Sequence, residues 1–311
     1  MQSLFDALRG SDQKCQKRKR ITILAVYITL ALILCALVAL GISALTSKSG
    51  NENNDKNDDG IIYVTRSATK SDIKSGDLIL VNKNNPISFE DNSELVSFTL
   101  GKGYGLKDNT LKAAPDALSA FDSMIAALNE NVVESDVVVM TAHRTKEYQD
   151  GLANGTPGGC SDFHTGMSFE LKDGDTYDSG YDNLNKVSKY DWLYANAHKF
   201  GFVVRYPDNT DSKSFSTITG VDNYAYVFRY VGVAHATYIF ENDLCLEEYL
   251  ELLRTNHKYG NSLKIGNDYE VYYTESTGEK TDVQVPTNFE YELSGDNMNG
   301  YIVTVLKANK K

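Results

Sequence analysis

The residues best suited to chemistry lie in two short segments near the middle of the chain. The first, Thr141-Ala142-His143-Arg144-Thr145, sets a guanidinium beside an imidazole, and the second, Ser161 to Glu170, reads SDFHTGMSFE. An arginine donates two parallel hydrogen bonds from a planar fork, so Arg144 suits a carboxylate. That carboxylate can belong to a bound ligand or to the protein itself, with Glu170 as the internal candidate. Both interpretations stay open.

Several residues of types that bind metals lie in or near these segments. They are His143, Cys160, Asp162, His164 and, farther along, His235. A metal site would require several of them to converge within about 2.0–2.3 Å of one ion. His164 directly follows Phe163, and in a strand that step turns a side chain to the opposite face. The simpler interpretation is favoured: these histidines, like His198, are surface or supporting residues.

The segments that must position these residues alternate between helical and strand patterns. Apolar residues at helical spacing predict helices over 113–129, 145–153, 190–200 and 246–254. Runs of β-branched and apolar residues predict strands over 77–82, 136–142, 167–171, 202–206 and 226–232. From about residue 265, YEVYYTESTG, TDVQVP, FEYEL and GYIVTVLK alternate apolar and polar residues between turns. We therefore predict an α+β fold, with helices packed on a central antiparallel sheet and a small all-β C-terminal extension.

The N-terminal part of the chain predicts a membrane anchor. Residues 21–45 (Ile21–Leu45) form an uncharged apolar run, and about 20 such residues span a bilayer. A cluster of basic residues precedes this run, which places residues 1–20 in the cytoplasm and the rest of the chain outside the cell membrane. A cleaved signal peptide is the alternative, but its apolar region is usually only about 7–15 residues long. Residues 46–60 are polar and charged, and are expected to form a flexible linker.

Charge and cysteine content limit the possible partners. The chain has 311 residues and a formal net charge of −11, which argues against nucleic acid, because binding phosphates requires a basic surface. Its four cysteines show no CxxC spacing. Only Cys160 and Cys245 follow the predicted membrane span, so they could form a disulfide or remain two independent thiols.

Four segments resemble the VanY-type D-alanyl-D-alanine carboxypeptidases, peptidase family M15, subfamily B. They are LVNK at Leu80–Lys83; TAHRT followed by Gln149, similar to the family's YRS…Q; SDFHTGMSFE, similar to S-x-H-x-x-G-x-A-x-D; and TGVDNYAYVFRYVG, similar to TG…E-x-W-H-x-R-Y-V-G. The resemblance covers roughly residues 77–252. It implies a Hedgehog-like M15 peptidase core over residues 61–262, a β-rich extension over 263–311, and a bacterial cell envelope.

The same resemblance implies a zinc site that this chain has lost. The family's three metal ligands fall on Phe163, Glu170 and Val227, and its catalytic base falls on Tyr224. Phenylalanine and valine have no lone pair to offer a metal, and a tyrosine, with a pKa near 10, is a poor base at neutral pH. Burying the two apolar side chains would fill the metal's space. We therefore expect no cofactor.

Three residues match the family's substrate-binding pattern, namely Arg144, Gln149 and Ser161. The leading hypothesis is a membrane-anchored, extracytoplasmic pseudoenzyme that binds a peptidoglycan stem peptide or an envelope protein. One alternative is an active zinc D,D-carboxypeptidase with rewired metal ligands. The other is an envelope interaction module that acts through the β tail, by pairing with a partner's sheet or packing on the main domain.

Overall fold

The computed structural model describes residues 60–87, 94–152, 155–174, 184–222 and 224–310, all within one compact unit, Asn54–Lys311. The predicted cytoplasmic tail and membrane span, and nearly all of the predicted linker, lie outside the described residues. They therefore stay predictions. Within the described ranges, no helix is both long and apolar enough to cross a membrane.

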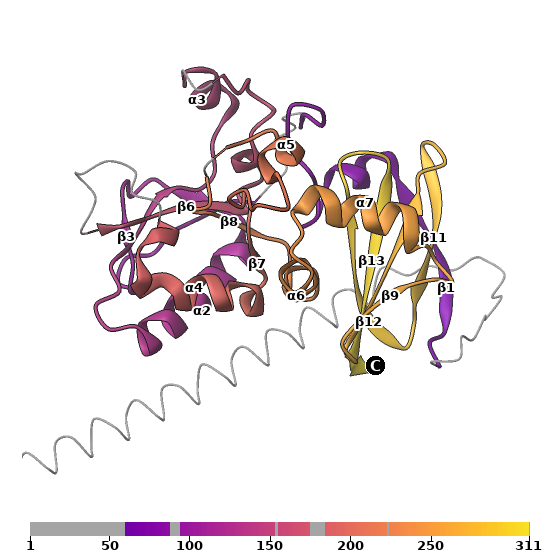
Figure 1. Cartoon of the computed structure of the whole chain (residues 1–311). Coiled ribbons are helices and arrows are strands. Elements are labelled where there is room, and N and C mark those ends of the chain that lie inside the picture. Colours follow the sequence, from indigo (N-terminus) through magenta and orange to yellow (C-terminus); the bar gives the residue numbers. More distant parts are fainter. Residues whose placement is uncertain (1–59, 88–93, 153–154, 175–183, 223, 311) are drawn as a thin grey trace, which may run out of the picture. The chain divides into compact units, whose positions relative to one another are not determined.

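A five-stranded mixed sheet forms the centre of the first half (Figure 1). Its strand order is β3 (Gly105–Leu106), β5 (Val137–Thr141), β6 (Ser168–Asp173), β8 (Val227–Tyr230) and β7 (Phe202–Val204). All neighbouring strands are antiparallel except β3 and β5, which are parallel. The predicted strands at 136–142, 167–171, 202–206 and 226–232 are thus confirmed, while the sheet is mixed and not wholly antiparallel.

Helix α2 (Pro115–Asn131) covers this sheet and confirms the helix predicted at 113–129. Proline at its first position suits a helix start, because proline's fixed φ is helical and its missing N–H would have no intrahelical partner there. Its buried residues recur at helical spacing: Ala117, Leu118, Phe121, Met124, Ile125 and Leu128. Phe121 packs against Phe169 of β6, with ring centroids 4.9 Å apart. This contact fixes the helix over the strand that carries Glu170.

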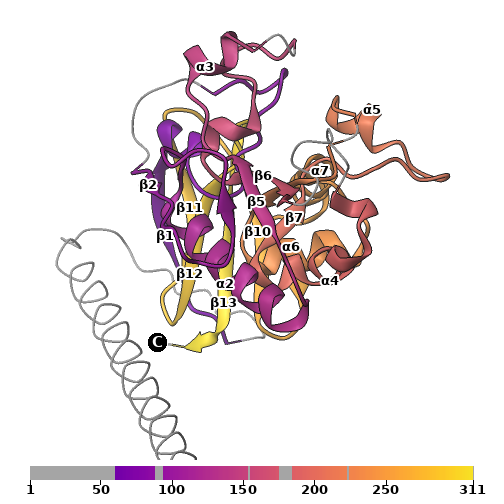
Figure 2. The ribbon, with the colours of Figure 1, turned by 90° about the vertical axis from the view of Figure 1, so that its left-hand side faces the viewer.

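The β strands of the second half include one strand from the other end of the chain. β12 (Phe289–Gly295), β13 (Gly300–Lys310), β10 (Tyr269–Glu275) and β9 (Leu263–Ile265) form a four-stranded antiparallel sheet in that order. β11 (Lys280–Pro286) pairs antiparallel with β1 (Tyr63–Thr69), and Figure 2 shows the two together. We call these six strands the β module. The β-rich tail is confirmed, but it does not stand alone, because residues 63–69 complete it.

Two helices join the β module to the five-stranded sheet. α6 (Val233–Glu241) contacts β7, and α7 (Leu246–Asn256) contacts β10. In Figure 1 α6 lies between the two groups of strands, and α7 crosses the upper part of the β module. Their apolar faces share one buried cluster with Leu78, Leu80 and Ile302. The helix predicted at 246–254 is confirmed.

The strand predicted at 77–82 is wrong. Its apolar residues are buried, but the backbone pairs with loops and side chains: Leu80 N–H donates to Asp296 O (3.0 Å), and Arg229 donates to Asp77 O (2.9 Å) and Ile79 O (3.1 Å). The apolar run is buried, but burial alone does not make a strand. Hydrogen bonds from the side chain of Arg229 replace the backbone hydrogen bonds that a neighbouring strand would supply.

The remaining elements are short. They are β2 (Val96–Ser97), β4 (Lys112–Ala113), α3 (Lys146–Asp150), α4 (Asp191–Asn196) and α5 (Phe215–Thr219). α3 is shorter than the helix predicted at 145–153. The helix predicted at 190–200 is α4 followed by a 3-10 turn, and it ends at Gly201, whose φ of 84° is left-handed.

Candidate functional site

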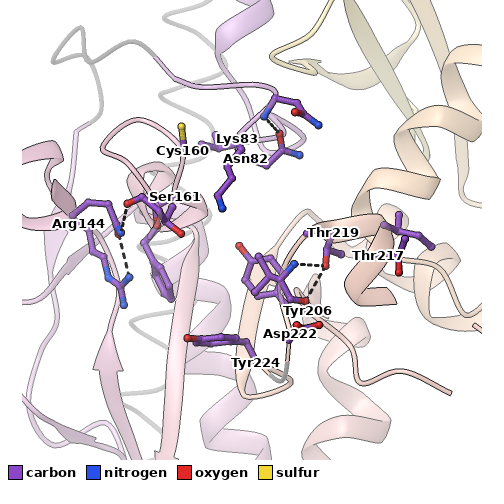
Figure 3. A pocket seen from close by; sticks show the side chains of 18 residues that line it. Asn82, Lys83, Arg144, Cys160, Ser161, Tyr206, Thr217, Thr219, Asp222 and Tyr224 are labelled. Atoms are coloured by element: carbon purple, nitrogen blue, oxygen red, sulfur yellow. Dashed lines mark hydrogen bonds between the residues drawn. The ribbon is translucent and has the colours of Figure 1, made fainter. Parts of the chain in front are cut away.

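One pocket is lined by several of the candidate site residues that the sequence analysis named (Figure 3). It has a volume of about 580 Å³ and is built from three segments, around residues 81–84, 144–163 and 206–224. The predicted substrate-binding residues Arg144, Gln149 and Ser161 all line it. Phe163 and Tyr224, at two positions of the family's catalytic centre, line it as well. The structure thus brings these five residues to one cavity.

Arg144 makes its internal contacts through its two Nη atoms and the face of its guanidinium, while its buried Nε has no hydrogen-bond partner among the described residues. Its Nη2 lies 3.2 Å from Glu170 Oε2, its Nη1 donates to Gln149 Oε1 (3.2 Å), and its guanidinium lies 4.0 Å from the centroid of the Phe163 ring. The side chains of Arg144 and Glu170 are only 12% and 9% exposed. Burial raises the pKa of Glu170, and the nearby Arg144 opposes that rise. The internal ion pair considered for Arg144 therefore exists.

The backbone around Phe163 explains how its ring reaches Arg144. Residues Asp162–Thr165 form a 3-10 turn that ends at Gly166, whose φ is 69°. A side chain at Gly166 would meet Leu95 and the backbone of Ala114, so glycine is required there for space as well as for its left-handed φ. Arg144 N–H donates to Phe163 O (3.2 Å), which holds the two residues together.

Phe163, Glu170 and Val227, which the sequence resemblance matched to metal ligands, do not form a metal site within the described part of the chain. Glu170 lies opposite Val227 on paired strands, and Val227 is fully buried. Phe163 is 6% exposed and belongs to the same apolar cluster as Val227. Neither side chain has a lone pair, and Glu170 is bound to Arg144. Within the described ranges no three His, Cys, Asp or Glu side chains are arranged to hold a metal. These residues do not fit zinc.

Tyr224, at the position of the family's base, is 41% exposed. Its ring centroid lies 5.5 Å from that of Tyr226 and 6.4 Å from that of Tyr206. It therefore presents an aromatic surface to the pocket.

His164 does not project from a strand, so the expected opposite-face argument is wrong, since the residue lies in the 3-10 turn. Its Nδ1 lies 2.7 Å from Arg144 O, and its Nε2 accepts from Gly159 N–H (3.0 Å). A carbonyl needs a donor and an N–H needs an acceptor, so the ring is neutral and carries its proton on Nδ1. Burial lowers the pKa of His164, which favours this form. His164 therefore links the backbone of Gly159 to the backbone of Arg144 through its two ring nitrogens.

The other candidates do not cluster as metal ligands within the described residues. His235 bridges Tyr249 OH (2.7 Å) and Thr304 Oγ1 (2.9 Å), and His198 stacks on Phe240 with ring centroids 4.0 Å apart. Cys160 and Cys245 are separate thiols; Cys160 is half-buried on the pocket and Cys245 is buried. The disulfide considered for them is therefore absent.

A buried charge network behind the pocket was not predicted as such. Asp162 Oδ1 lies 2.7 Å from Arg229 Nη1 and 3.3 Å from Arg205 Nε, and Ser168 also donates to Asp162. Arg205 in turn makes two hydrogen bonds with Glu247, at 3.0 and 2.8 Å. Burial acts to raise the pKa of Asp162, but the two arginines and Ser168 outweigh it and lower the pKa. Asp162 is thus an anion that stabilises the fold through Arg229 and Arg205.

The chain is similar to known cell-wall peptidases. The family model for D-alanyl-D-alanine carboxypeptidase, VanY, matches residues 110–233. A D-alanyl-D-alanine carboxypeptidase of Enterococcus faecium is 29% identical over 255 residues, covering 78% of this chain and 80% of that protein. One from Enterococcus faecalis is 30% identical over 199 residues, covering 58% and 68%. The crystal structure of the D,D-dipeptidase VanXYg with a D-Ala-D-Ala phosphinate analogue has a TM-score of 0.64 at 24% identity, covering 78% of this chain and 99% of that one. That likeness shows the fold.

Proposed function

Because this chain belongs to the VanY family of D-alanyl-D-alanine carboxypeptidases, we propose that it is a pseudoenzyme of that family, which binds a peptidoglycan stem peptide without cleaving it. The observation that carries the proposal is the set of contacts at the metal position. Phe163 and Val227 are buried apolar side chains, and Glu170 is held by Arg144 at 3.2 Å. A zinc peptidase needs three protein ligands and an open position for water, and this set supplies neither.

A retained pocket supports binding. Solved relatives were crystallised with D-alanine-D-alanine or with a D-Ala-D-Ala phosphinate analogue, and the present pocket is lined by Arg144, Gln149 and Ser161. About 580 Å³ is ample for a short peptide. The apolar floor at Phe163 and the exposed ring of Tyr224 offer surface for the methyl groups of such a peptide.

We also propose that residues 21–45 anchor the chain in the cell membrane, with the described domain outside. The length of the apolar run and the basic residues before it support this topology. Protease added to intact cells should degrade the domain but spare a tag on the N-terminus. Protection of both ends would contradict the proposal.

The test of catalysis is a zinc measurement on the full chain, purified in detergent without chelators. We expect far less than one zinc per chain by elemental mass spectrometry, and no release of D-alanine from a stem peptide when zinc is added. A relative with its zinc ligands intact is the positive control. Near-stoichiometric zinc with D-alanine release would contradict the proposal and favour an active enzyme with rewired ligands.

A further inference from the structure

The charged side chains of the pocket are unequally available to a ligand. Among the described residues, the pocket is lined by Lys83, Arg144 and Asp222 as charged groups. The Nη atoms of Arg144 are engaged by Glu170 and Gln149, its guanidinium lies over Phe163, and its Nε, although without a hydrogen-bond partner among the described residues, is buried. A ligand carboxylate at Arg144 would therefore have to compete with Glu170, which is nearly buried and cannot move into water without disrupting the core.

Lys83 is free of such competition. Its side chain is exposed, and it makes no ion pair within the described residues. Figure 3 shows the lysine reaching into the pocket, on the side where Ser161 lies. Ser161 is 7% exposed, and its hydroxyl has no hydrogen-bond partner among the described residues. An ammonium and a hydroxyl on one side of a cavity form a suitable pair of donors for an anion.

The backbone that carries Lys83 is held firmly, although the residue lies in a loop. Asn82 Oδ1 accepts from the N–H groups of Asn84 and Asn85 (both 3.0 Å), which closes a tight turn around Lys83. Asn297, from the loop between β12 and β13, donates to Leu80 O (2.9 Å) and Asn85 O (3.1 Å) on either side of that turn. The β module thus fixes the position of Lys83.

Asp222 also lines the pocket, apart from Lys83 in Figure 3, and makes its own part of the pocket unfavourable for an anion. It is exposed and follows α5 in the chain, whereas Lys83 belongs to the turn at residues 82–85. A ligand with one negative end is therefore attracted to the Lys83 side and repelled from the Asp222 side, which gives it one preferred orientation.

We propose that Lys83, with Ser161 as a second donor, binds the C-terminal carboxylate of the peptide ligand, and that Arg144 serves as a wall of the pocket through its ion pair with Glu170. This inference rests on the proposed function, since it names the residues that hold the carboxylate of that ligand. It assigns the negative end of the peptide to the segment that the β module supports.

The test compares two probes, acetyl-L-Lys-D-Ala-D-Ala and the same peptide with a C-terminal amide. Calorimetry on the full chain in detergent should show that the acid binds about tenfold more tightly than the amide, because a charged hydrogen bond is lost with the amide. In Lys83→Gln the acid should bind about as weakly as the amide does, with amide binding unchanged. Lys280→Gln, an exposed lysine on β11 outside the pocket, is the matched control and should behave as wild type.

The possible outcomes separate this inference from the proposed function. If the wild type binds neither peptide, the proposed function is wrong and the inference is wrong with it. If the wild type binds both equally, or if Lys83→Gln keeps the preference for the acid, only the inference is overturned. Loss of that preference in Arg144→Gln but not in Lys83→Gln would assign the carboxylate to Arg144 instead.

Discussion

Arg144 and Glu170 form an ion pair beside the pocket, and the sequence resemblance matched Glu170 to a metal ligand. The two side chains are 3.2 Å apart and almost enclosed, so each satisfies the charge of the other. Gln149 adds a hydrogen bond to Arg144, and Phe163 covers its guanidinium. The charge of Glu170 is thus balanced by an arginine of the chain itself.

Removing one partner of this pair should be costly. We expect Glu170→Gln to lower the free energy of unfolding by about 2–3 kcal/mol, because Arg144 is then left charged and poorly solvated. Arg144→Met should cost a similar amount. The double variant should cost less than the two single losses added together, because neither charge remains unpaired. Urea unfolding of all four proteins measures this coupling, and strictly additive losses would show that the pair does not act as a unit.

At the scale of residues, the sequence predicted chemistry better than it predicted contacts. Residue types alone showed that Phe163 and Val227 cannot bind a metal, and both are buried as expected. The pairing of Arg144 with Glu170 was one of two open interpretations. The partnership of Arg205 with Glu247 was not predicted, because an ion pair between residues far apart in the chain leaves no local pattern. Lys83 was seen only as part of a motif, since its exposure and direction appear only in the fold.

At the scale of elements, the β module combines the strand β1 with the C-terminal strands and also supports the pocket. Periodicity predicted its strands in the C-terminal segment well, because alternation of apolar and polar residues is a local signal. The pairing of β1 with β11 joins residues 63–69 to residues 280–286, and no local signal specifies that pairing. The same limitation explains the wrong strand at 77–82, whose buried residues are held by Arg229 and by the β12–β13 loop.

The β module should therefore not be separable from the rest of the domain. A chain that ends at residue 262 loses β11, the partner of β1, and exposes the apolar cluster that α6 and α7 share with β10 and β13. We expect this truncated chain to lack a cooperative urea transition. A cooperative transition like that of the full chain would mean that the module is an independent addition.

Asn297 offers a finer test of the same support. Its φ of 57° is left-handed, so Asn297→Gly removes the side chain without forcing a strained backbone. We expect a loss of about 1–2 kcal/mol, since two carbonyl groups lose a donor, and faster hydrogen exchange at residues 80–85. Asn299→Ala, in the same loop but with its amide bound to Glu275, should leave exchange at those residues unchanged. Equal hydrogen exchange at residues 80–85 in both variants would show that Asn297 does not support the segment that carries Lys83.

At the scale of the whole molecule, His235 connects the two halves. It lies on α6, and its ring bonds to Tyr249 of α7 and to Thr304 of β13. The imidazole is 3% exposed, and burial lowers its pKa to about 3. Both ring nitrogens face hydroxyl groups, which can donate or accept, so the neutral ring is fully hydrogen-bonded in either tautomer.

This buried histidine should make the stability of the domain depend on pH. The pKa is about 6.5 in the unfolded chain and about 3 in the folded one, so below pH 6.5 the unfolded state binds the proton and the folded state does not. The contribution of His235 to stability is thus complete above pH 6.5 and is lost progressively as the pH falls toward 3. Between pH 6.5 and pH 5 we expect a loss of about 2 kcal/mol from this residue.

The measurement is a difference between two proteins, because carboxylates and the other histidines titrate as well. Wild type and His235→Gln are unfolded in urea at several pH values; the amide of glutamine keeps a donor and an acceptor but does not titrate. The variant should be less stable at pH 7, where its packing is imperfect, and the two stability curves should approach one another as the pH falls from 6.5. Parallel curves would mean that His235 is not the group that binds the proton on unfolding. Converging curves would identify this contact between helix α6 and strand β13 as the point at which acid loosens the two halves of the domain.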